Sequence, residues 1–102
     1  MIQMPRTVRV GPHVFKVERR PVARMPVVDG AKPNACCDSD GLLVTIREKL
    51  QRSKVQEFSV HEFLHAIWPD GDNKEEAHVT ELAPQLLQLI QDNPDFIKFL
   101  TQ

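Results

Sequence analysis

Two histidines and a glutamate lie close together in the segment His61-Glu62-Phe63-Leu64-His65, which has the pattern H-E-x-x-H. On a helix, residues four apart share a face, so both imidazoles can reach one metal ion. Glu62 would lie beside that ion and could take a proton from water. The pattern therefore predicts a metal centre with His61 and His65 as ligands and Glu62 as general base, which is the chemistry of a zinc hydrolase.

The third ligand is expected from the helix that follows, where three glutamates compete. At about 100° per residue, Glu76 points the same way as the apolar stripe of that helix. A carboxylate there would be costly to bury unless a metal ion partnered it. Glu75 falls at the other edge of the stripe and is the reserve candidate, whereas Glu81 falls on the polar side. Glu76 is the predicted third ligand; the alternative is a charge that only complements the positive end of the helix.

The remaining histidines are predicted to be ordinary surface residues. A third histidine ligand would require the longer pattern H-E-x-x-H-x-x-G-x-x-H. This chain has Trp68 at the glycine position and Gly71 at the histidine position, which leaves a His/His/Glu set. His78 falls on the far side of its helix from Glu76, and His13 lies in a predicted turn.

Three helices are predicted in the C-terminal half, over residues 53–68, 74–91 and 95–100. Ser53 and Gln56 fit a capping box at the start of the first helix, and Pro69 predicts its end. Pro84 removes a backbone donor within the second helix, so we expect a bend there. Asn93-Pro94 is a favourable start for the third, which is expected to close onto the core.

The N-terminal half carries strand patterns. Residues 7–10 and 14–18 alternate around a turn and predict a β-hairpin. A further strand is expected over residues 42–46, and residues 20–35, rich in proline, are expected to be irregular with a short strand around 22–28. We therefore predict an α+β fold in one domain, residues 1–102: a small antiparallel sheet, a hairpin plus one or two strands, packed on two main helices in a minimal zincin-like arrangement.

Composition excludes several classes of function. The net charge of −1 gives no electrostatic reason to expect binding to nucleic acid or to an acidic membrane. The longest apolar runs are far shorter than a membrane span, and the N-terminus does not resemble a signal peptide. Cys36 and Cys37 are adjacent, which disfavours a bridge between them, and no C-x-x-C pair exists. We expect reduced thiols and a cytoplasmic location.

The C-terminal half resembles a family of small phage- and prophage-encoded proteins described as minimal zinc metallopeptidases of the gluzincin type. The resemblance is carried by His61-Glu62-Phe63-Leu64-His65-Ala66-Ile67, by Glu76-x-x-Val79-x-x-Leu82-Ala83-Pro84 and by Asp92-Asn93-Pro94. It implies zinc bound by His61, His65 and Glu76, Glu62 as catalytic base and, if phage-encoded, a place in the host cytoplasm. It also implies that the strand over residues 42–46 is the sheet edge along which an extended peptide lies.

The leading hypothesis is thus a zinc-dependent metallopeptidase that acts on a peptide or protein. The alternative is a non-catalytic protein in which a structural zinc site joins the helices and the surface binds a partner. A structural site should be closed by four protein ligands, whereas a catalytic site keeps one position for water. A third reading treats the motif as accidental in a helical interaction module.

Overall fold

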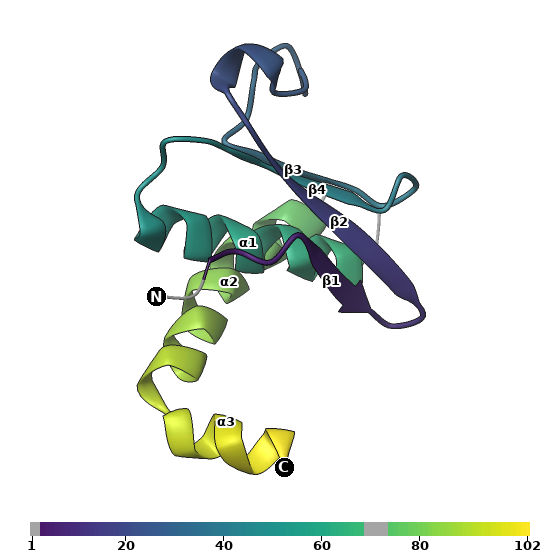
Figure 1. Cartoon of the computed structure of the whole chain (residues 1–102). Coiled ribbons are helices and arrows are strands. Elements are labelled where there is room, and N and C mark those ends of the chain that lie inside the picture. Colours follow the sequence, from purple (N-terminus) through teal and green to yellow (C-terminus); the bar gives the residue numbers. More distant parts are fainter. Residues whose placement is uncertain (1–2, 69–73) are drawn as a thin grey trace.

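The computed structural model describes residues 3–68 and 74–102. Its elements are β1 (Thr7–Val10), β2 (His13–Arg20), a short 3₁₀ turn (Val22–Arg24), β3 (Ala35–Asp38), β4 (Leu43–Arg47), α1 (Arg52–Ile67), α2 (Glu75–Asp92) and α3 (Pro94–Thr101). In Figure 1 the sheet lies on one side of α1, α2 crosses the other side, and α3 continues from the far end of α2. The predicted α+β class is confirmed.

The four strands form one sheet in the order β1-β2-β4-β3. The outer pairs are antiparallel, but β2 and β4 run parallel, with Val17 opposite Val44. The sheet is therefore mixed, a difference from the antiparallel sheet that the sequence predicted. Parallel neighbours require a long connection, and the segment from Arg20 to Leu43, which includes β3, is long enough to bring β4 back beside β2.

The strand predicted around residues 22–28 does not form. Val22–Arg24 is a 3₁₀ turn instead, and farther on Val28 and Ala31 form an isolated bridge. Asp29 and Gly30 make the tight turn between them with φ of 51° and 80°. The prolines in this stretch remove backbone donors that a ladder would need. Regular pairing resumes only at β3.

β4 is a central strand, so the prediction that residues 42–46 form an edge is wrong. It is hydrogen-bonded to β2 on one side and to β3 on the other. Val44, Thr45 and Ile46 are almost completely buried, at 0%, 2% and 0% exposure. Of the two edge strands, β1 and β3, β3 has the more extensive contact with α1.

The hydrophobic core fixes α1 on the sheet. Four buried side chains from β2 and β4 form its centre: Phe15, Val17, Val44 and Ile46. Phe63 of α1 packs against them, and its ring meets that of Phe15 edge-on at 6.2 Å. On its other side α1 contacts α2, which buries Val79 and Ala83. α1 thus has a defined rotation about its axis, and this sets the direction of the H-E-x-x-H side chains.

The start of α1 differs from the predicted capping box. Gln51 occupies the N-cap with extended backbone angles, and its carbonyl accepts from the N–H groups of Lys54 and Val55. Ser53 lies within the first turn and is not the N-cap. The N-cap therefore lies two residues before the serine that the capping signal favoured. Its end at Ile67 is one residue short of the predicted end.

α2 and α3 match their predicted spans within two residues, and Pro84 lies inside α2. Pro94 opens α3, as predicted. The expectation that α3 closes onto the core is wrong, because Phe96, Phe99 and Leu100 are 46%, 73% and 59% exposed. Within the described ranges, no helix combines the length and the apolar character that crossing a bilayer requires.

Candidate metal centre

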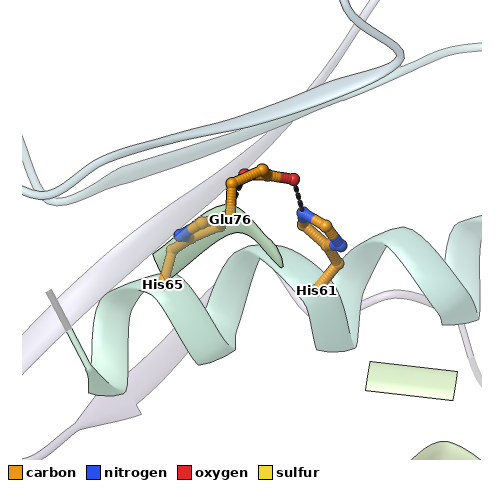
Figure 2. A group of neighbouring side chains, drawn as sticks. All are labelled: His61, His65 and Glu76. Atoms are coloured by element: carbon orange, nitrogen blue, oxygen red, sulfur yellow. Dashed lines mark hydrogen bonds and ion pairs between the residues drawn. The ribbon is translucent and has the colours of Figure 1, made fainter. Parts of the chain in front are cut away.

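The two motif histidines lie one turn apart on α1 and point to the same side of the helix (Figure 2). Their ring centroids are 5.1 Å apart. Both side chains are mostly covered, with 20% and 14% exposure for His61 and His65. This is the shared face that the four-residue spacing predicted.

Glu76, in the first turn of α2, reaches between the two imidazoles (Figure 2). Its Oε1 lies 2.8 Å from Nε2 of His61, and its Oε2 lies 2.7 Å from Nε2 of His65. One ligand atom from each of the three residues lies within 4.8 Å of the others, so the group could hold a metal ion. The structure therefore brings together the three residues that the sequence predicted as ligands. Thr80, one turn later, donates to Oε1 of Glu76 at 3.3 Å.

The predicted reason for choosing Glu76 was partly wrong. Its side chain is 65% exposed, so no burial cost singles it out. Glu75 is the better shielded neighbour, with 16% exposure. The helical wheel assumed that the apolar stripe of α2 is covered along its whole length. The first turn of α2 instead lies beside an open cleft, where a residue in line with the stripe reaches solvent.

Glu75 contacts the same histidine from the opposite edge of the ring. Its Oε2 lies 2.5 Å from Nδ1 of His65, whereas Glu76 contacts Nε2. Burial lowers the pKa of His65, but the hydrogen bond to Glu75 and the neighbouring carboxylates of Glu76 and Glu62 outweigh it and raise that pKa above its ordinary value. Sequence reasoning treated Glu75 only as a substitute ligand. The signal that could have separated the two glutamates is that consecutive helical residues point about 100° apart, so they do not meet a neighbouring ring at the same edge.

The other candidate residues lie away from this group. His78 stacks on Trp68 with the ring planes 8° apart, and both line a separate pocket that Glu81 also borders. His13 lies at the exposed start of β2. Both histidines are exposed, as the sequence predicted, although His13 belongs to β2 and not to the turn before it.

Glu62 is the one residue of α1 that is buried, at 7% exposure. Burial raises the pKa of its carboxyl to about 7; the negative charge of Glu76 also raises it, and His65 opposes the shift. A carboxyl that titrates near neutral pH can both accept and return a proton. Its position beside the two histidines in the sequence puts it at the same cleft.

The candidate centre opens into a cleft of about 670 Å³ between the edge strand and the two helices. Its walls combine charged groups from α1 and α2 with β3 and the segments on either side of it: Val28, Asp29, Pro33, Ala35, Cys36, Cys37, Ser39, His61, Glu62, His65, Glu75 and Glu76. The sequence did not predict the contribution of β3, because an Ala-Cys-Cys segment in proline-rich surroundings carries little strand signal.

Both cysteines are free, as the sequence predicted. Burial raises the pKa of Cys37 to about 11, and burial together with the charge of Glu62 raises the pKa of Cys36. Neutral thiols are poor nucleophiles and poor metal ligands. The cysteines therefore line the cleft as small, weakly polar side chains.

Comparison of the chain with family models, with curated proteins and with solved structures found no match.

Proposed function

We propose that the chain is a zinc-dependent metallopeptidase of the small phage- and prophage-encoded gluzincin type. The observation that carries this proposal is the position of Glu76, whose two carboxylate oxygens lie within 2.8 Å of the Nε2 atoms of both motif histidines. Side chains from two helices thus converge on one point beside a buried glutamate. Cation centres that catalyse hydrolysis need this combination of ligands and base.

The donor set suits zinc. Two imidazole nitrogens and one carboxylate are the protein ligands of the His₂Glu class, and three ligands leave a coordination position for water. Within residues 3–68 and 74–102, the group comprises His61, His65 and Glu76 and no fourth ligand, which favours a catalytic over a structural site. Bound zinc would supply a Lewis acid that polarises the peptide carbonyl and makes water acidic near pH 7.

Glu62 is suited to move the proton. Its carboxylate would accept a proton from the attacking water and return it to the nitrogen of the leaving amine. A base should have a pKa near the working pH, and burial brings that of Glu62 to about 7. The positive charge of a bound cation would favour the ionised form that must accept the proton.

The substrate is proposed to be an extended peptide segment. β3 is an edge strand and borders the cleft, so its outer side is a place where a peptide could add as a further strand. Ala35, Cys36 and Cys37 of β3 lie on the same cleft as the histidines. This arrangement would place a peptide bond beside the candidate metal centre. β3, and not residues 42–46, is then the proposed edge for the peptide.

The test is hydrolysis of an unstructured protein by the zinc-loaded chain, with bound zinc measured in the same samples. Glu62→Gln should retain zinc and lose activity by about 10²–10⁴-fold, because proton transfer is impaired while the ligands remain. Glu81→Gln makes the same change of charge at an exposed position of α2 and should behave as the wild type. Glu76→Gln should lose zinc and activity together.

Two results would contradict the proposal. A wild-type chain that does not bind zinc would remove its basis. Zinc binding with no hydrolysis, or with equal hydrolysis by the wild type and Glu62→Gln, would favour the non-catalytic zinc-binding protein instead.

A further inference from the structure

The imidazole of His65 is bonded at both ring nitrogens, by two successive residues of α2. Nε2 lies 2.7 Å from Oε2 of Glu76, on the side of the candidate ion. Nδ1 lies 2.5 Å from Oε2 of Glu75. Among the described residues, the hydrogen bond of His61 is to Glu76 alone. The two histidines therefore differ in how their rings are held.

The contact between Glu75 and His65 is shielded from solvent. The two side chains are 16% and 14% exposed, whereas Glu76 is 65% exposed. A hydrogen bond to a carboxylate is stronger where water is largely excluded. Glu75 is thus placed to hold the ring firmly, and Glu76 is placed where an ion can reach it.

We propose that Glu75 is a positioning residue of the metal centre, whose carboxylate accepts the Nδ1–H of His65 and turns Nε2 of that ring toward the ion. The inference rests on the proposed function in so far as it requires a metal ion at His61, His65 and Glu76. A neutral imidazole with its proton on Nδ1 has its lone pair on Nε2. A carboxylate on the outer nitrogen fixes that tautomer and makes the ligand nitrogen more basic.

The competing role for Glu75 is that of third ligand, in place of Glu76. Such a ligand must lie near the Nε2 atoms of both histidines. Glu76 meets this condition with one oxygen toward each ring, whereas Glu75 contacts the opposite edge of His65. Adjacent glutamates therefore have separate roles on one imidazole: one faces the ion and the other orients the ring.

Zinc affinity provides the first test, measured by competition with a chromophoric chelator. Glu75→Gln should weaken zinc binding by about 10–100-fold, the usual effect of removing an outer partner of a ligating histidine. Glu75→Ala should weaken zinc binding further than Glu75→Gln does. The amide oxygen of glutamine can still accept a hydrogen bond from His65, whereas alanine has no acceptor. Glu81→Gln, with the same charge change on the same helix, should bind as the wild type does. Glu76→Gln should lose more zinc affinity than either Glu75 variant.

The second test observes the imidazole N–H groups themselves, by ¹H–¹⁵N spectroscopy of the histidines in the zinc-loaded protein. The Nδ1–H of His65 should resonate downfield and exchange slowly with water. Glu75→Gln should move that signal upfield and speed its exchange, and leave the signals of His61 in place. A residue that merely supports the helix would not alter one histidine selectively.

The outcomes separate this inference from the proposed function. Glu75 variants that bind zinc as tightly as the wild type, with an unchanged His65 signal, would overturn the positioning role and leave the metallopeptidase standing. A crystal structure of the zinc-loaded protein that shows Glu75 itself bound to zinc would also overturn it. A wild-type chain that binds no zinc would instead remove the proposed function and this inference together.

Discussion

Glu62 combines two properties that rarely coincide in one residue: it carries a carboxyl and it is buried. Its exposure is 7%, and its pKa is raised from 4.5 to about 7, first of all by burial. Proteins seldom bury a carboxylate without a compensating charge, because the ionised form loses its hydration. In the metal-free protein this residue should therefore reduce stability, a cost that a bound cation would offset.

Glu62→Gln is accordingly expected to stabilise the metal-free protein at pH 8, by about 3 kcal/mol. The folded state binds the proton of Glu62 more tightly than the unfolded state does. The wild type therefore loses stability as pH rises from about 4.5 through about 7, whereas an amide does not titrate. Urea unfolding in the presence of a chelator, between pH 4 and pH 8, would measure the difference.

Glu81→Gln serves as the matched control for this measurement, because Glu81 is exposed and lies away from the centre. The free energy of unfolding of Glu81→Gln should differ little from that of the wild type across the pH range. A stability difference between Glu62→Gln and the wild type that does not grow with pH would show that burial of the charge is not its cause.

The thiol of Cys37 should react slowly with alkylating reagents. Only the thiolate reacts, and burial raises the pKa of this group from 9.0 to about 11. At pH 8 its thiolate fraction, and with it the rate, should be about 100-fold below that of an ordinary thiol. The Cys36→Ser variant leaves Cys37 as the reacting thiol. Mass spectrometry would give its rate of alkylation in the folded chain and in the chain unfolded by urea. Equal rates in the two conditions would contradict the shift.

The elements that the sequence predicted well are those whose signal is local. The spans of α1, α2 and α3 follow from periodicity and from prolines at their ends, and they are right within two residues. The four-residue spacing that places His61 and His65 on one face of α1 is also a local signal. Such features depend on neighbours along the chain, which a sequence displays directly.

The features that the sequence did not predict are long-range. β4 was expected at an edge, yet it lies between β2 and β3, because strand order depends on pairing between distant segments. β3 was missed since its residues carry little strand propensity by themselves. The different exposures of Glu75 and Glu76 depend on which part of α2 is covered, and this is fixed by the packing of α2 on α1.

The central position of β4 has a measurable consequence for stability. Ile46 is 0% exposed within the core cluster, so Ile46→Ala should lower the free energy of unfolding by about 2–5 kcal/mol. This is a large part of the 5–15 kcal/mol typical of a domain. Val14→Ala on β2 removes a side chain that is 52% exposed and should cost less than about 1 kcal/mol.

Urea titrations of the two variants would make this comparison. Equal losses from Ile46→Ala and Val14→Ala would be inconsistent with a buried, central β4. The comparison also bears on the site, since α1 packs on the sheet through Phe63 and the orientation of its histidines depends on that core.

On the scale of the whole molecule, the candidate centre joins two layers of the fold. His61 and His65 belong to α1, which packs on the sheet, whereas Glu75 and Glu76 belong to α2, which packs on the outer side of α1. Ligands from both helices reach one ion only when the helices are docked. Binding of an ion should therefore be coupled to folding.

Zinc is accordingly expected to stabilise the chain as any ligand that binds only the folded state does, by about 4 kcal/mol when free zinc is 1,000 times its dissociation constant. Thermal unfolding with and without zinc measures the shift in Tm. Glu76→Gln should lose the shift because it removes the link from α2, whereas His78→Ala, at a histidine that stacks on Trp68, should retain it. Magnesium, which prefers all-oxygen ligands, should produce no comparable shift. Equal stabilisation of the wild type and Glu76→Gln would mean that zinc binds elsewhere and that the centre does not join the helices.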